Sequence, residues 1–157
     1  MQQLIKTIFI SFIILVFFGN TTFTKENKIL IKVNNEIITT IDILNEINFL
    51  SIMNKEFRSI EKKEKINIAK NSLIKQKIKF IEISKYKKNL NLDNSIFENI
   101  VKSYFINFQI NNLNEFEVFF NKQNLDPTFV KKKILVDTFW NRLIYEKFSQ
   151  NVKINID

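Results

Sequence analysis

The chain has 157 residues, of which 45% are hydrophobic and 25% charged, a composition that suits one folded domain and argues against wholesale disorder. It contains no His, no Cys and one Gly, which excludes His-based catalysis, thiolate chemistry, zinc–thiolate sites and glycine-rich phosphate-binding loops. The net charge is +8, but the lysines are scattered among glutamates and form no compact basic stripe, so a nucleic-acid partner is not predicted.

Residues 1–24 have the pattern of an export signal. Lys6 precedes an apolar run over 7–18, which has the length of a signal-peptide core and is shorter than the roughly 20 residues needed to span a bilayer. No Ala-x-Ala cleavage motif is present, and cleavage after Thr24, with Thr22 at position −3, fits the preference poorly, so this segment is predicted to be a signal peptide or a short N-terminal anchor. Residues 25–157 are predicted to form one domain in the periplasm, either released or tethered to the inner membrane through this leader.

A β-hairpin is predicted over residues 29–39. Apolar residues alternate along its first strand, and Asn34-Asn35 tolerates the positive φ angles of a tight turn. Thr39 is expected to cap a helix that follows, because its hydroxyl can accept a hydrogen bond from the first turn while Asp42 reaches back in a capping box. Apolar residues then follow at helical spacing: Ile43, Ile47 and Leu50.

A longer helix with a broad apolar stripe is predicted over residues 65–88. Lys77 falls inside the stripe and is expected to extend its ammonium group to water. Asn89 is expected to end the helix in the left-handed conformation. Residues 92–95 then indicate the start of a further helix, which continues through Phe105.

Two more helices are predicted before the C-terminus. Asn114 and Glu117 have the spacing of a capping box for a short helix, which Asn124 is expected to end. Asp126 followed by proline is a strong start signal for a last helix over 127–148, because proline at the first helical position loses no hydrogen bond.

The final residues, 152–156, alternate like a short strand that is expected to pair with the hairpin. The predicted fold is therefore mainly α-helical, with a small β element formed from the two chain ends. No internal repeat or linker divides it.

The order of these elements resembles the N-terminal domain of SurA-type periplasmic chaperones and related parvulin-linked foldases. VNNEIITTIDI, residues 33–43, looks like the family's entry strand, turn, strand and first helix. Residues 69–92 look like its central helix, and residues 116–144 like its aromatic helix, turn and long basic helix. The resemblance covers essentially all of 25–157 and rests on the order and spacing of three segments behind a leader.

The resemblance implies a holdase that binds unfolded or partly folded outer-membrane proteins. It does not imply prolyl isomerase activity, because a parvulin domain needs its own sheet, glycine-rich loops and often His residues. We therefore expect no enzyme, no catalytic residue, no cofactor and no metal. The family's C-terminal segment is also missing, which is expected to leave an apolar surface for a partner or for self-association to cover.

Aromatic residues are the candidate binding residues, because 17 Phe and one Trp are a heavy load for this length. Most are expected in the core. The remainder are expected to form an apolar groove rimmed by lysine that takes extended polypeptide segments. The predicted peptide-binding residues are Phe105, Phe108, Phe116, Phe119, Phe120, Phe139 and Trp140.

Other functions remain open from the sequence. The alternative hypothesis is a non-catalytic assembly or scaffold subunit that docks on a specific envelope partner. Two further hypotheses are a protein that binds anionic lipid or nucleic acid, and a relic of a longer foldase. Glu61 and Glu64 are flanked by lysines and predict a solvated face, while Ser72 and Ser103 have no His to act as a base.

Overall fold

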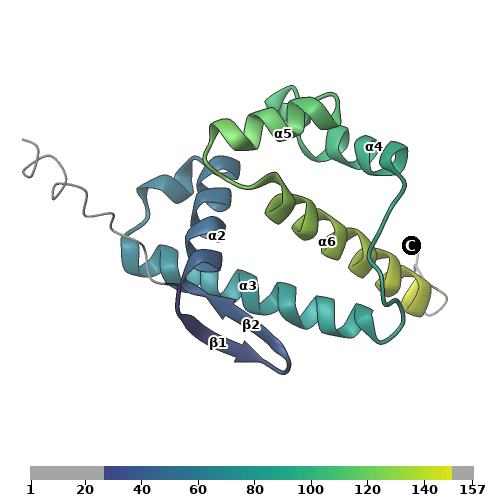
Figure 1. Cartoon of the computed structure of the whole chain (residues 1–157), viewed down its shortest axis with the longest axis horizontal. Coiled ribbons are helices and arrows are strands. Elements are labelled where there is room, and N and C mark those ends of the chain that lie inside the picture. The colour runs from purple at the N-terminus through teal and green to yellow at the C-terminus, as the bar shows by residue number, and fades with distance from the viewer. Residues whose placement is uncertain (1–26, 150–157) are drawn as a thin grey trace, which may run out of the picture.

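The structure, a computed structural model, describes residues 27–149 and is mainly helical with a two-stranded antiparallel sheet (Figure 1). This confirms the predicted mainly α fold with a small β element. The predicted leader, 1–24, and the predicted C-terminal strand, 152–156, lie outside the described residues. In chain order the elements are β1 (Ile29–Val33), β2 (Glu36–Thr39), α2 (Thr40–Met53), the 3-10 turn η1 (Glu56–Ser59), α3 (Lys62–Ser84), α4 (Asn94–Tyr104), the 3-10 turn η2 (Ile106–Phe108), α5 (Leu113–Lys122) and α6 (Pro127–Phe148).

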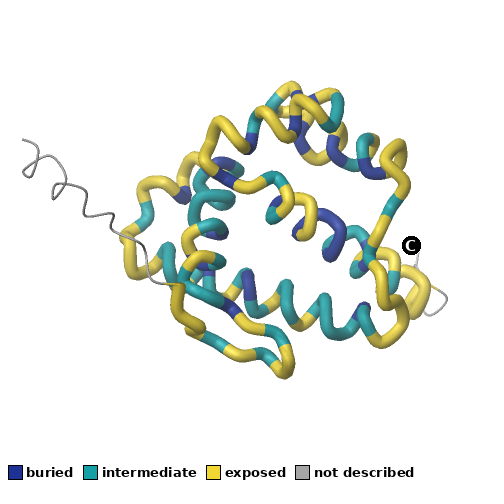
Figure 2. The backbone as a smooth tube through the Cα atoms, in the orientation of Figure 1, coloured by how far each residue is buried: buried dark blue, intermediate teal, exposed yellow. Residues whose placement is uncertain are grey.

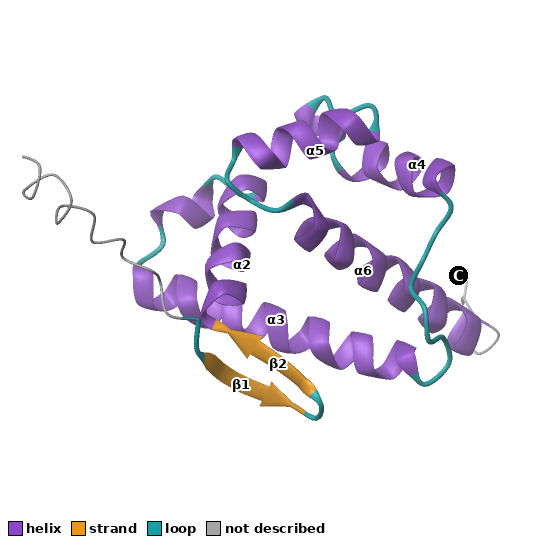
Figure 3. Cartoon of the chain, viewed as in Figure 1, coloured by secondary structure: helices purple, strands orange, loops and turns teal. Residues whose placement is uncertain are grey.

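The hairpin forms where it was predicted and lies against α3 (Figure 3). Val33 stands opposite Glu36, so the turn holds two residues, and Asn34 adopts the left-handed region with a φ of 52°. Asparagine tolerates this conformation better than most residues, which explains its place in the turn. Lys77 of α3 does not extend to water alone, because its Nζ lies 2.7 Å from the Glu36 carboxylate and ties the hairpin to the helix.

The starts of α2 and α6 are confirmed in detail. Thr39 accepts a hydrogen bond from the backbone N–H of Asp42 at 3.3 Å, and the Asp42 carboxylate accepts one from the Thr39 N–H at 2.7 Å. Asp126 caps α6 by accepting from the Thr128 N–H at 2.8 Å, with proline next to it in the first turn. Both starts depend on residues within one turn, which is why local sequence predicts them.

The predicted limits of α3 were wrong. The helix begins at Lys62, before the predicted start, because its first turn has good helix formers but no apolar residue to mark it. It ends at Ser84, and Asn89 is not in the left-handed conformation. Leu90 and Leu92 pack against the core soon afterwards, so the chain leaves the helix early enough to turn back.

The predicted cap of α5 was also wrong, by two positions. Asn112, rather than Asn114, accepts from the backbone N–H of Glu115 at 2.8 Å. The Asn112–Glu115 pair has the same spacing as the predicted Asn114–Glu117 pair. The earlier start brings Leu113 into the first turn, where it packs against the core.

Asn124 ends α5 as predicted, with a φ of 54°. Its N–H donates to the Asn121 carbonyl at 3.0 Å, and the Leu125 N–H donates to the Phe120 carbonyl at 3.0 Å. These two bonds form a Schellman motif, in which a left-handed residue closes the helix. Leu125 and Phe120 are both buried, so the motif also brings the chain back to the core.

The core has two clusters that share helices, and the buried positions lie where the helices face one another (Figure 2). The larger cluster, here called the aromatic core, joins α4, α5 and α6 with the ends of α2 and α3. The smaller cluster lies under the hairpin and consists of Ile38, Ile43, Ala69 and Leu73. Phe129 of α6 packs against both clusters.

Candidate functional site

Four of the seven predicted peptide-binding residues lie inside the aromatic core. Phe105 and Phe120 are 0% exposed and Phe116 is 2% exposed. The rings of Phe105 and Phe120 meet edge to face with centroids 5.3 Å apart, and those of Phe116 and Phe120 are 5.0 Å apart. Phe139 is also buried. In this conformation these four side chains stabilise the fold and do not face a ligand.

The other three predicted residues are half-buried. The rings of Phe108 and Phe119 lie 5.4 Å apart, at the margin of the aromatic core. Trp140 of α6 packs against the same core. All seven residues therefore belong to the aromatic core or pack against it. Their assignment to a peptide-binding surface stays a prediction.

A different surface forms a hollow suited to a ligand. It lies between β1, α2 and the first half of α3 and has a volume of about 370 Å³. This volume falls within the range of known ligand clefts, about 300–1,000 Å³. We call it the apolar groove, and its lining residues are Leu30, Thr40, Ile43, Leu44, Ile47, Lys62, Lys65, Ile66 and Lys70.

The floor and walls of the apolar groove are aliphatic. Ile43 is buried under the groove, whereas Leu44 is 38% exposed and Leu30 of β1 is 48% exposed. Ile47 and Ile66 also line the groove and are half-buried. Single exposed apolar residues are ordinary, but several that gather beside a hollow mark an interaction surface. The hairpin end of the domain therefore carries an apolar face that no described element covers.

The rim of the apolar groove is positively charged. Lys62, Lys65 and Lys70 all come from α3, and none of the residues that line the groove is acidic. Lys65 donates to the carbonyl of Arg58 at 2.7 Å. None of these lysines forms an ion pair with an acid in the described part of the chain. The site thus combines apolar burial with uncompensated positive charge.

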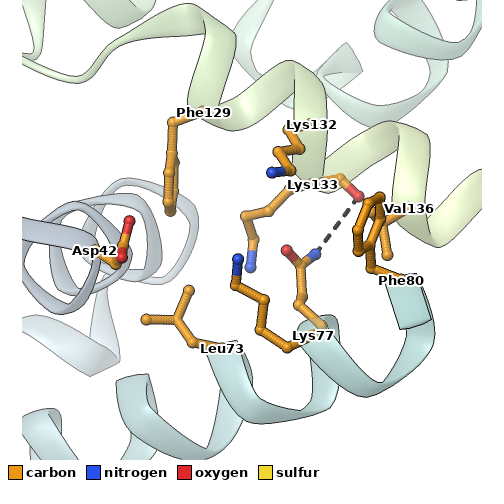
Figure 4. Close-up of a pocket in the computed structure, with 9 residues that line it drawn as sticks. Asp42, Leu73, Lys77, Phe80, Phe129, Lys132, Lys133 and Val136 are labelled. Carbon is orange, nitrogen blue, oxygen red and sulfur yellow. Dashed lines mark hydrogen bonds between the residues drawn. The ribbon is translucent and has the colours of Figure 1, made fainter. Parts of the chain in front are cut away.

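A smaller cavity of about 80 Å³ lies where α2, α3 and α6 meet (Figure 4). In Figure 4 the side chains of Lys77 and Lys133 point into it from facing helices, and the Gln76 amide donates to the Lys133 carbonyl at 3.5 Å. We call it the junction pocket. Its volume is enough for a few water molecules. It is lined by Asp42, Leu73, Gln76, Lys77, Phe80, Phe129, Lys132, Lys133 and Val136.

A buried ion pair lies beside the junction pocket, and sequence reasoning missed it. Lys133 Nζ lies 2.9 Å from both carboxylate oxygens of Glu46, which is 0% exposed. Ser72 donates to the same carboxylate at 2.6 Å. The sequence did carry a signal for this pair. Glu46 lies on the apolar stripe of α2, and Lys133 lies on the apolar stripe of α6. A buried charge needs such a partner, so two helices of this kind are expected to meet.

The charges of the junction pocket are largely balanced. Lys133 is paired with Glu46 and Lys77 with Glu36. Lys132 is exposed, and its ammonium group lies 5.4 Å from the centre of the Phe80 ring. An anion in this pocket would have to compete with carboxylates that already hold two of the three ammonium groups. We therefore regard the junction pocket as a structural joint and the apolar groove as the candidate site.

Two features often found at functional sites are absent from residues 27–149. No group of three acidic side chains there is arranged to hold a metal ion. Every buried side-chain nitrogen and oxygen in this range has a hydrogen-bond partner. None of the described helices has the length and apolar character needed to cross a bilayer.

Comparison with models of known protein families, with curated protein sequences and with solved structures found no match to the chain. The resemblance to the SurA N-terminal domain therefore stays a prediction from the order and spacing of its elements. The apolar groove is the feature of residues 27–149 from which a function can be inferred.

Proposed function

We propose that the protein is a non-catalytic holdase chaperone, which binds extended apolar segments of non-native polypeptide in the apolar groove. The observation that carries this proposal is an aliphatic hollow that no described element covers, on a domain with a buried core. Binding there would rest on apolar burial, at about 25 cal/mol per Å², with little reading of sequence. Capture would be reversible and would need no nucleotide.

The position of the groove beside β1 favours an extended polypeptide as the ligand. β1 pairs with β2 along one edge, and no other described strand pairs with its second edge. An incoming strand could therefore add its backbone hydrogen bonds at this edge, as in β-augmentation. Alternate side chains of that strand would then turn toward the groove, because successive residues of a strand point to opposite faces.

We further propose that the clients are unfolded outer-membrane proteins in the periplasm. Strands of membrane β-barrels alternate apolar and polar residues, which matches a groove that takes every second side chain. The signal-like leader and the resemblance to SurA-type chaperones support this location and client class. Catalysis forms no part of the proposal.

The proposal is tested by aggregation of a urea-diluted outer-membrane barrel protein, followed by light scattering with and without the purified protein. We expect suppression near a one-to-one ratio. The double variant Leu30→Ser, Leu44→Ser should lose most of it, because it removes two exposed walls of the groove. The double variant Ile96→Ser, Ile106→Ser is the matched control, since it removes two apolar residues that are at least as exposed and do not line the groove.

Two outcomes would contradict this assignment. No suppression by the folded wild-type protein would remove the holdase function itself. Equal loss in the groove variant and the control variant would show that clients bind exposed apolar surface in general, and not the groove.

A second candidate is an assembly or scaffold subunit that docks on one folded envelope partner. The observation in its favour is that the groove is small and well defined, which suits one specific partner as well as many clients. A saturable one-to-one complex with a folded partner, without suppression of aggregation, would favour this function over a holdase.

A further inference from the structure

The lysines on the rim of the apolar groove form a row along α3. Lys62 and Lys65 are one turn apart, and Lys70 follows five residues later. At about 1.5 Å per residue the row spans roughly 12 Å. An extended chain covers that length in about four residues. The row is thus long enough to meet acidic side chains on both sides of a short apolar segment.

Among residues 27–149, no acidic side chain lines the groove or forms an ion pair with this row. Glu61 and Glu64 lie next to it in sequence, but both are exposed and neither lines the groove. Lys62 is the first residue of α3, so the partial positive charge of the helix N-terminus adds to the lysine charges there. Each of these ammonium groups would gain an ionic partner if a carboxylate came within about 4 Å.

We propose that the apolar groove selects polypeptide segments in which a short apolar stretch is flanked by Asp or Glu. This inference rests on the proposed peptide binding and adds a charge preference to it. A lipid with an anionic head group shares part of this chemistry. The polypeptide is favoured because the edge of β1 with which no described strand pairs offers backbone hydrogen bonds that an acyl chain cannot use.

The test uses fluorescence anisotropy with the full chain and three labelled peptides that share one alternating apolar core. Their flanks are Glu, Gln or Lys. Each exposed ion pair contributes a factor of about two in affinity, so three predict roughly eightfold tighter binding of the Glu-flanked peptide than of the Gln-flanked one. The preference should shrink at high salt. The triple variant Lys62→Gln, Lys65→Gln, Lys70→Gln should bind both peptides alike.

A matched control separates the rim from the net charge of the protein. The triple variant Lys55→Gln, Lys88→Gln, Lys122→Gln removes the same charge from exposed lysines that do not line the groove. It should keep the preference for Glu flanks. Equal loss of the preference in this control would overturn the inference, because overall charge would then explain it.

The remaining outcomes separate the charge preference from the proposed peptide binding. Equal binding of Glu-flanked and Gln-flanked peptides to the wild type would overturn the charge preference and leave peptide capture standing. Binding of none of the three peptides would overturn the proposed function as well. Vesicles of phosphatidylglycerol and of neutral lipid test the alternative ligand. The groove would be assigned to lipid if only the phosphatidylglycerol vesicles displace the peptide, and do so at a lower concentration than unlabelled Glu-flanked peptide.

Discussion

Asp126 shows how one capping residue can set part of the acid sensitivity of the fold. Its carboxylate accepts hydrogen bonds from the Thr128 N–H at 2.8 Å and from the Thr128 hydroxyl at 2.5 Å. These bonds favour the charged form, so the pKa of Asp126 lies below its usual value, with the hydroxyl bond as the main cause. The folded state therefore holds this proton less tightly than the unfolded state. The cap stabilises the protein above the unfolded pKa of about 3.9 and loses that contribution as the pH falls through the lower folded value.

The prediction is that Asp126→Asn changes stability little at neutral pH and flattens its decline below about pH 5. Asparagine can still cap the helix but does not titrate. Urea unfolding followed by circular dichroism across the acid range measures this. Asp93→Asn is the control, since the side chain of Asp93 makes no capping hydrogen bond at the start of α4. Parallel acid limbs in wild type and Asp126→Asn would contradict the assignment.

At the scale of elements, the buried pair Glu46–Lys133 joins α2 to α6. Lys133→Met should lower the free energy of unfolding by about 3–5 kcal/mol, because it leaves the Glu46 carboxylate buried without a counter-charge. The double variant Glu46→Met, Lys133→Met should recover most of that loss, since an apolar pair of similar size carries no desolvation cost. Denaturant unfolding of both variants measures the coupling.

A second ion pair provides the comparison for this prediction. Lys79 of α3 lies 2.6 Å from Asp137 of α6, but both side chains are about 30% exposed. Water screens such a pair, so Lys79→Met should cost less than about 1 kcal/mol. If the two single variants lose equal stability, burial is not what makes the Glu46–Lys133 pair matter.

The elements also show which features the sequence could predict. The hairpin turn at Asn34, the capping box of Thr39 and the start of α6 at Asp126 depend on neighbours within one turn, and all three were confirmed. The predicted cap of α5 was wrong because the pairs Asn112–Glu115 and Asn114–Glu117 have equal spacing, and the packing of Leu113 decides between them. The predicted end of α3 was wrong for a similar reason, because the packing of Leu90 and Leu92 decides where the chain turns after Ser84.

The candidate site was harder to predict than the helices. Phe105 and Phe120 follow helical spacing, which marks a buried stripe and a binding surface alike, so their burial follows only from the packing of α4, α5 and α6. The apolar groove combines Leu30 with Leu44 and Lys70, residues that are distant in sequence. No periodicity within one element can predict such a hollow, because it arises where three elements meet.

At the scale of the whole molecule, the two core clusters share helices and should unfold together. α2 contributes Ile43 to the smaller cluster and Ile52 to the aromatic core, and α3 contributes Leu73 and Ile83 in the same way. Unfolding of α2 or α3 would therefore disrupt both clusters at once. Domains of this size commonly unfold in one cooperative step. Trp140, the single tryptophan, reports on the aromatic core, whereas far-UV circular dichroism reports on all helices.

We therefore predict that the fluorescence and circular-dichroism transitions coincide in denaturant, and that they shift together when a peptide binds the apolar groove. A ligand at one hundred times its Kd should add about 2.7 kcal/mol to the free energy of unfolding. Because the groove lies between β1, α2 and α3, Trp140 would sense this gain only through the shared helices. If circular dichroism shifts while the Trp140 transition stays in place, the groove and the aromatic core are separate cooperative units, and binding at one would leave the other unaffected.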